Sequence, residues 1–169
     1  VGGSLSYAGA PMLAGGGALR SGTGLVRVAL PWTACSVAPR RFASLIVLPV
    51  GPPQGRFLTA ACVADIGGLL ERTDAVVFGP GVGKPREALP VLRALLHTDR
   101  PMLVDADGLR ALAQLDADSA TRDSPTVLTP HPGEMHALLD GFGLGHVAGQ
   151  SRRDQALALA EHLGATVVL

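Results

Sequence analysis

The sequence has few cysteines and few aromatic residues. Only 2 of its 169 residues are cysteines, Cys35 and Cys62, and they stand far apart among apolar neighbours. We therefore predict reduced thiols in a protein core, as is typical of a cytosolic protein, rather than a disulfide framework. A zinc site is not predicted either, because His131 and His136 lie off one helix face and no cysteine pair is near them.

An excess of charge of either sign is also absent. Lysine and arginine together number 14, and so do aspartate and glutamate. The sequence has no basic block or aromatic-rich stripe, which argues against nucleic-acid binding. Nor does any uncharged run approach the ~20 apolar residues of a membrane-spanning helix, since runs such as Leu45–Val50 end at glycine and proline. We expect neither nucleic acid nor a membrane among the partners.

Short runs rich in valine and leucine recur along the chain. With 47% apolar and 17% charged residues, the composition is that of a compact globular protein. Several of the runs are apolar throughout, as strands of a parallel sheet are when both faces are covered. We predict strands at Gly24–Leu30, Leu45–Val50, Ala75–Phe78, Met102–Val104, Thr126–Thr129 and Thr166–Leu169.

Helical patterns lie between these strands, at Ala8–Arg20, Pro85–His97 and Ser151–Leu163. The last should be capped by Ser151, end at Gly164 and turn Leu157 inward with its alanines and Leu163. Strands that alternate with helices predict one α/β domain over residues 1–169, with three α/β/α layers and a mainly parallel sheet. We expect this domain to be truncated at both ends, because Val1 lies in the tail of a strand and Leu169 in the middle of one.

Three predicted neighbouring strands end in unusual residues. Ala75–Phe78 runs into a glycine turn, Met102–Val104 into two aspartates, and Thr126–Thr129 into a histidine between two prolines. The residues Val1-Gly2-Gly3-Ser4 resemble a fourth such strand end. In an open parallel sheet, ligands bind beyond the carboxyl ends of the strands. We therefore predict that these turns meet at one edge and border one cavity.

The glycine turn reads GPGVGK, from Gly79 to Lys84. Glycine lets backbone N–H groups approach a ligand, so Gly79 and Gly81 are candidates for a phosphate-binding turn. The turn is not a P-loop, because Phe78 stands where that motif needs glycine and Pro85 where it needs serine or threonine. The structural alternative is a tight connection from a strand to a helix.

The aspartates are Asp105 and Asp107, in the stretch DADGL. Asp107 could be the N-cap of a helix over Gly108–Leu115. Asp105 has no such role, and a carboxylate at a strand end suits a Mg²⁺ and phosphate site, because hard cations prefer oxygen ligands.

The histidine is His131, in the stretch TPHPGE. Pro130 and Pro132 restrict the backbone on both sides, so the imidazole is presented in a nearly fixed direction. The structural alternatives are a turn histidine and, for Glu134, an acid favoured by the helix dipole in the first turn of a helix.

The order and spacing of these motifs resemble the ADP-dependent NAD(P)H-hydrate dehydratases, a branch of the ribokinase-like superfamily. The matching stretches run in the family's order over the whole chain: GGSLSYAGAPMLAGGGALRSGTGLVRVALP, DAVVFGPGVGKP, PMLVDADGLRAL and TVLTPHPGEMHALL. The resemblance implies a ribokinase-like three-layer fold. It also implies a repair reaction, in which hydrated NADH or NADPH is dehydrated back to the normal cofactor with ADP as co-substrate.

By the same resemblance, Ala10, Gly83 and His131 would line the pocket for the hydrated nicotinamide nucleotide. Glu134 would hold Mg²⁺ through water, and Asp105, from its place at a strand end, is the second candidate for that ion. The resemblance further implies a cytoplasmic homo-oligomer, of homotetramer type, and a fused or separate NAD(P)H-hydrate epimerase as partner.

The resemblance places the catalytic aspartate in a GTGD element after the last predicted strand, and no such element occurs up to Leu169. We therefore expect no catalytic residue within the chain, and most of the ADP site outside it. Two other functions remain open for these residues: a ribokinase-like kinase for a vitamin or sugar, and a non-catalytic nucleotide-binding remnant.

Overall fold

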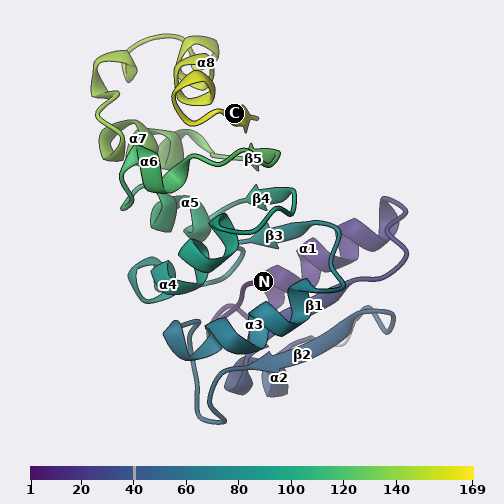
Figure 1. The fold of residues 1–169 in the computed structure, drawn as a ribbon. Coiled ribbons are helices and arrows are strands. Elements are labelled where there is room, and N and C mark those ends of the chain that lie inside the picture. Colours follow the sequence, from purple (N-terminus) through teal and green to yellow (C-terminus); the bar gives the residue numbers. More distant parts are fainter. Residues whose placement is uncertain (40) are drawn as a thin grey trace.

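The computed structural model describes residues 1–39 and 41–169 (Figure 1). Its strands follow the valine- and leucine-rich runs of the sequence and differ from the predicted ranges only at their ends. They are β1 (Arg27–Pro31), β2 (Ile46–Val50), β3 (Val76–Phe78), β4 (Met102–Val104), β5 (Thr126–Leu128) and β6 (Thr166–Val167).

All recorded strand pairs are parallel. The strands β3, β4, β5 and β6 form one sheet in that order, and β1 pairs with β2. Val76, Met102 and Thr126 are aligned across the first three strands, which confirms the predicted neighbours. The carboxyl ends of these strands therefore open onto the same edge of the sheet.

The first residues of the chain join the two sheets. The Val1 amine donates to the Val77 carbonyl at 2.8 Å, and the Gly79 amide donates to the Val1 carbonyl at 3.3 Å. On the other side, the Gly2 amide donates to the Ala29 carbonyl in β1 at 3.2 Å. Residues 1–3 thus lie between β1 and β3 like a strand, although their hydrogen bonds are too few for them to be assigned as one.

Helices and short 3₁₀ turns separate the strands. The helices are α1 (Gly9–Arg20), α2 (Trp32–Val37), α3 (Val63–Leu70), α4 (Pro85–Leu96), α5 (Asp107–Leu112), α6 (Ala117–Ala120), α7 (Pro132–Gly141) and α8 (Arg152–Leu163), and the turns are η1 (Ala60–Cys62) and η2 (Gly145–Val147). Within the described ranges, no helix has the length and apolar character needed to cross a membrane.

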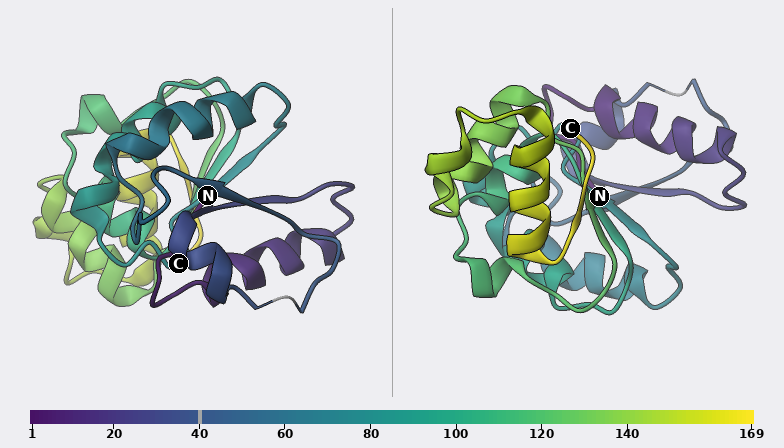
Figure 2. Two further views of the ribbon diagram at one scale, coloured as in Figure 1. Left: turned by 90° about the horizontal axis from the view of Figure 1, so that it is seen from below. Right: turned by 90° about the horizontal axis from the view of Figure 1, so that it is seen from above.

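The helices form two layers with separate cores. The larger core packs α3 to α8 against β3, β4 and β5 and also includes Ala29 of β1 and Val50 of β2. The smaller core packs α1 and α2 against β1, and Figure 2 shows α1 on the opposite side of the strands from α3 and α4. The architecture is α/β/α, as predicted, but its second helix layer reaches only β1 and β2. Val77 on β3 is 39% exposed as a result, whereas its neighbour Phe78 is fully buried.

The helix predictions were right about ends and partly wrong about faces. Ser151 caps α8, its hydroxyl accepting from the Asp154 amide at 3.2 Å, and Gly164 ends the helix with φ 61°. Leu163 is buried as predicted, but Leu157, also predicted to point inward, is 48% exposed, because Leu159 is buried in its place.

The glycines of α1 have low helix propensity, yet α1 forms a full helix because these glycines allow neighbouring side chains to pack closely against it. A Cβ at Gly16 would lie 2.5 Å from the ring of Phe42. Only glycine therefore allows Phe42 to pack against this helix. The close approach compensates for the unfavourable propensity.

Candidate active site

The turns after β3, β4 and β5 are joined by hydrogen bonds at the carboxyl edge of the sheet. The Asp105 amide donates to the Phe78 carbonyl at 3.0 Å. The Thr129 amide donates to the Val104 carbonyl, and the Thr129 hydroxyl donates to Asp105 Oδ1 at 2.9 Å. Consecutive parallel strands therefore bring the glycine turn, the aspartates and the approach to His131 together, as the sequence predicts.

Gly79 must be glycine for this arrangement to form. Its φ is 121°, and a Cβ there would lie 1.9 Å from the Asp105 carbonyl oxygen. Any other residue would push the β3 and β4 turns apart. The glycine turn thus connects a strand to a helix and also brings its backbone into close contact with the backbone of the β4 turn.

The segment that leads into α1 packs on the other side of the glycine turn. The Gly3 amide donates to the Pro80 carbonyl at 2.8 Å, and the buried Ser4 hydroxyl donates to the Gly81 carbonyl at 2.9 Å. A Cβ on Gly81 would lie 3.1 Å from the Cβ of Ala10. Ala10 and the glycine turn are therefore neighbours.

Asp107 binds the glycine turn and is not a helix cap. Its Oδ2 accepts from the Gly83 amide at 2.8 Å. Helix α5 begins at Asp107 itself, with Ala106 at the N-cap position. The carboxylate is therefore turned back to the preceding loop, which rules out the capping interpretation.

Ala106 has a backbone conformation that side chains other than glycine rarely adopt. Its φ is 50° and its ψ is −128°. It is the only non-glycine residue with positive φ in the described part of the chain. Strain of this kind costs about 1–3 kcal/mol and clusters at functional sites. Here it lies between Asp105, which faces Thr129, and Asp107, which faces Gly83.

His131 and Glu134 form a capping box at the start of α7. His131 is the N-cap, and its Nδ1 accepts from the Gly133 amide at 3.0 Å and from the Glu134 amide at 3.3 Å. Glu134 Oε2 accepts from the His131 amide at 3.0 Å. Because Nδ1 is an acceptor, the neutral ring carries its proton on Nε2, which lies 3.3 Å from Glu134 Oε1.

A structural role for His131 in the turn is therefore compatible with a role in binding. His131 is a turn histidine that caps a helix, and its side chain is also 59% exposed at the edge where the strands end. Glu134 is buried, and both of its oxygens face His131. Among residues 1–39 and 41–169, no group of three or more histidine, cysteine or acidic side chains could hold a metal ion.

Several neighbours of the site were missed by the sequence analysis. Thr129 was read only as the end of a strand, although its hydroxyl holds Asp105. Lys84 was read only as the end of the glycine turn, but its ammonium lies 4.4 Å from the centre of the Phe57 ring and pairs with Glu87 at 2.9 Å. The one signal in the sequence was that Thr129 is the last residue of a predicted strand and Lys84 the last residue of the glycine turn.

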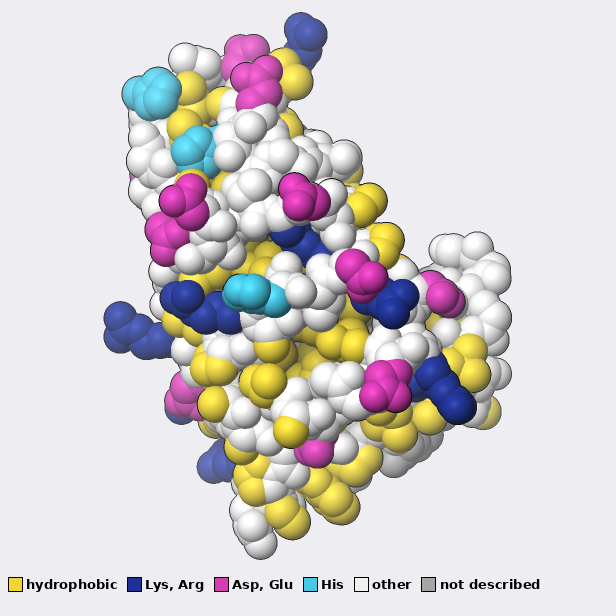
Figure 3. Space-filling model, in the orientation of Figure 1, with side chains coloured by type: hydrophobic (Ala, Val, Ile, Leu, Met, Phe, Trp, Pro, Cys, Tyr) yellow, Lys and Arg dark blue, Asp and Glu magenta, His cyan; other side chains and the backbone are white. Residues whose placement is uncertain are grey.

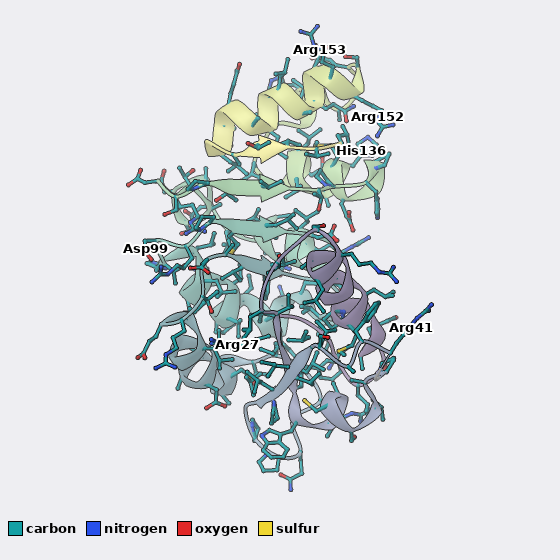
Figure 4. The ribbon with its side chains drawn as sticks, turned by 90° about the vertical axis from the view of Figure 1, so that its right-hand side faces the viewer. Arg27, Arg41, Asp99, His136, Arg152 and Arg153 are labelled. Carbon is teal, nitrogen blue, oxygen red and sulfur yellow. The ribbon has the colours of Figure 1, made fainter. Side chains whose placement is uncertain are left out.

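Two surface hollows lie away from these residues. One, of about 550 Å³, lies between α3, α4 and residues 97–100, and the other, of about 310 Å³, lies between α4 and α6. Both open at the amino edge of the sheet, marked by Asp99 in Figure 4, whereas His136 on α7 marks the opposite edge. Neither hollow is lined by a candidate residue. The predicted common cavity of the glycine turn, Asp105 and His131 is therefore not among them.

The larger hollow has an apolar floor. Val63, Ile66 and Leu70 contribute to it, and apolar side chains show between charged ones in the middle of the face drawn in Figure 3. Beside it, Arg122 donates from Nη2 to the carbonyls of Thr98 and Arg100. Burial lowers the pKa of Arg122.

The profile of the NAD(P)H-hydrate dehydratase family matches residues 1–169. A bifunctional NAD(P)H-hydrate repair enzyme of Gloeobacter violaceus is 40% identical over 153 residues, which cover 90% of this chain and 29% of that enzyme. One of Mycobacterium tuberculosis is 36% identical over 167 residues, 99% of this chain and 30% of that enzyme. The chain thus spans less than a third of the length of these curated relatives.

Solved structures share the fold. An ADP/ATP-dependent NAD(P)H-hydrate dehydratase of Bacillus subtilis, crystallised with ATP and Mg²⁺, has a TM-score of 0.75 and 25% identity, over 100% of this chain and 55% of that one. A ribokinase-like superfamily protein of Enterococcus faecalis has a TM-score of 0.75 at 22% identity, over 99% of this chain and 55% of that one. The ribokinase-like fold implied by the sequence motifs is confirmed.

Proposed function

This chain belongs to the NAD(P)H-hydrate dehydratase family, and on that basis we propose that the protein restores NADH and NADPH from their hydrated forms in an ADP-dependent dehydration. The observation that carries the proposal is the joining of the glycine turn to the β4 and β5 turns at one edge of a ribokinase-like sheet. Gly83, Asp107, Asp105 and Thr129 make that junction through hydrogen bonds.

The substrate would lie against Ala10, Gly83 and His131. Ala10 packs beside the glycine turn, and the exposed His131 ring lies after the last strand of the junction. The Nε2 proton of His131 faces Glu134, but the ring is open to solvent and can donate to a polar group of a nucleotide. His131 would then position the substrate and would not exchange protons with it.

Of the three glycines in the turn, Gly81 would contact phosphate through its amide. The Gly79 amide donates to the Val1 carbonyl and the Gly83 amide to Asp107, so both are occupied within the protein. In the described ranges the Gly81 amide has no protein acceptor. The α4 N-terminus follows directly at Pro85, and helix N-termini favour anions. Gly79 would shape the turn, and Gly81 would donate to the phosphate.

Asp105 and Glu134 fit a magnesium ion that is held through water. Mg²⁺ usually keeps several waters and takes one or two protein carboxylates together with substrate phosphates. The absence of a larger carboxylate cluster in the described ranges suits such an ion and would not suit a fully protein-ligated one. When bound, the ion would offset the charge of the phosphates.

The remaining chemistry needs a proton acceptor and a leaving group. Phosphorylation makes the hydroxyl of the hydrate a good leaving group, and a carboxylate must take its proton. The family resemblance assigns that carboxylate to a GTGD element, which residues 1–169 do not contain. The side chains described here would bind, orient and screen the substrate.

The test uses the complete gene product with hydrated NADH, ADP and Mg²⁺, and follows the return of NADH absorbance. We expect turnover that stops when ADP is left out. Phosphorylation of a vitamin or sugar from ATP, without dehydration, would instead identify a small-molecule kinase. Nucleotide binding without either reaction would identify a non-catalytic protein.

The partners and setting form part of the same proposal. Curated relatives are named bifunctional repair enzymes, which supports a fused or cooperating NAD(P)H-hydrate epimerase. We also propose a cytoplasmic location and a homo-oligomer, of homotetramer type, for the complete protein. Gel filtration with light scattering on the complete gene product measures the oligomeric state.

A further inference from the structure

Tyr7 is a large side chain left exposed in a tightly held turn. Its side chain and backbone are 58% exposed, whereas Ser4 before it is fully buried and Ala8 after it is 5% exposed. The turn is fixed at both ends, because the Tyr7 amide donates to the Ser4 carbonyl at 3.1 Å and the Tyr7 carbonyl accepts from the Ala10 amide at 3.4 Å. Its backbone therefore has little freedom to turn the ring away.

The ring lies along the glycine turn. A Cβ on Gly83 would lie 3.4 Å from Cδ2 of Tyr7, and a Cβ on Gly81 would lie 3.1 Å from Cβ of Tyr7. One side of the tyrosine thus packs on the backbone that carries the proposed substrate contact. The rest of the ring is in solvent.

We propose that Tyr7 is a substrate-positioning residue, whose ring forms a flat platform for a heterocyclic ring of the dinucleotide. This proposal rests on the proposed function, and it adds a contact to Ala10, Gly83 and His131. Tyrosine suits the role because it offers a large rigid surface with only two side-chain torsions to fix, and because its hydroxyl tolerates water.

Position separates Tyr7 from other exposed apolar residues. Single apolar residues on a surface are common and need no explanation, and Leu13 on α1 is 65% exposed without contact to the glycine turn. Tyr7 differs because it touches the turn at both Gly81 and Gly83. Leu13 therefore provides a matched control on the same segment.

The test compares Tyr7→Phe, Tyr7→Leu, Tyr7→Ala and Leu13→Ala in the complete gene product. With hydrated NADH as variable substrate, Tyr7→Ala should raise KM about 5- to 150-fold, the range that base–aromatic stacking contributes. Tyr7→Leu fills the same space without a flat ring and should lose most of this binding. Tyr7→Phe and Leu13→Ala should stay within about 2-fold, and the KM for ADP should not change in any variant.

Several results would overturn the platform. An unchanged KM in Tyr7→Ala would do so, and so would equal losses in Tyr7→Phe and Tyr7→Ala, which would indicate a hydrogen bond from the hydroxyl. Recovery in Tyr7→Leu would reduce the role of Tyr7 to packing against Gly83. Thermal unfolding of each variant separates these effects from loss of fold.

Direct binding keeps the platform and the proposed function separately testable. If the unmodified protein does not dehydrate the hydrate, the proposed function fails, and calorimetric titration of NADPH into Tyr7→Ala and the unmodified protein still tests the platform. Titration with reduced nicotinamide mononucleotide identifies the ring. A Tyr7-dependent affinity for the mononucleotide assigns the platform to the nicotinamide side, and dependence for the dinucleotide alone assigns it to the adenine. Equal affinities with and without Tyr7 would refute the platform.

Discussion

Replacing Asp107 tests the junction between the glycine turn and the β4 turn. In Asp107→Ala the Gly83 amide loses its carboxylate acceptor at 2.8 Å. Hydrogen bonds to charged groups contribute about 1.5–3 kcal/mol, and partial exposure of this pair favours the lower end. We therefore expect the free energy of the local opening that exposes the Gly83 amide to fall by about 1.5 kcal/mol. In Asp107→Asn an uncharged oxygen remains, and about half of the effect should persist.

Hydrogen exchange at the glycine turn measures this directly. A loss of about 1.5 kcal/mol corresponds to roughly 10-fold faster exchange, read by mass spectrometry on a peptide that spans the turn. Asp107 also lies in the first turn of α5, where a carboxylate adds about 0.3–1 kcal/mol of helix stability. That contribution changes the melting temperature but not exchange at Gly83, so the two readouts separate the roles.

Asp123→Ala serves as the control, because Asp123 is an exposed acid outside any helix or strand. It should leave exchange at the glycine turn unchanged. In the complete gene product, Asp107→Ala should also raise the KM for the hydrated cofactor, because Gly83 is a proposed contact. Unaltered exchange of the turn in Asp107→Ala would refute the junction as described.

Three further substitutions test neighbouring features. Gly79→Ala should destabilise the protein by more than about 3 kcal/mol in thermal unfolding, because the new Cβ clashes with the Asp105 carbonyl. The control Gly17→Ala has open space around it and should stabilise α1 by about 0.5–1 kcal/mol. Similar melting temperatures for the two variants would contradict the close contact at Gly79. Ala106→Gly should raise the free energy of unfolding by about 1 kcal/mol, since relief of positive-φ strain exceeds the entropy cost of glycine; a lower melting temperature would argue against strain. His131→Ala should lower the stability by about 1 kcal/mol in thermal unfolding through loss of the helix cap, whereas His131→Asn should keep the cap. A raised KM for the hydrated cofactor in both variants would support a substrate contact. A raised KM in His131→Ala alone would restrict the role of His131 to capping.

Strand positions and the shared edge could be predicted from the sequence because each depends on a local pattern. Apolar runs such as Met102–Val104 are recognisable without tertiary information, and parallel order then places their ends together. Ser151 and Gly164 likewise bound α8 through local chemistry. These features need only the residues beside them.

The partners of Asp107 and Glu134 could not be predicted, because they depend on three-dimensional placement. Asp107 looked like a helix cap by sequence, but the conformation of Ala106 turns it toward Gly83. For Glu134, nothing in the sequence indicated that both of its oxygens would face His131. The inward face of α8 was misjudged at Leu157 because the packing of neighbouring elements, not helix periodicity alone, decides which side is buried.

The hydrogen bonds of residues 1–3 with β1 and β3 have a consequence for how the chain folds. These residues are synthesised before β3, yet Val1 pairs with Val77, 76 positions away. Closing so long a loop carries an entropy cost before any contact compensates for it, and such pairings slow folding. Each sheet can form from contacts between residues closer in sequence, but the hydrogen bonds of residues 1–3 that join the sheets cannot form until β3 is present. During synthesis on a ribosome, residues 1–3 would therefore pair between β1 and β3 only after β3 has been made.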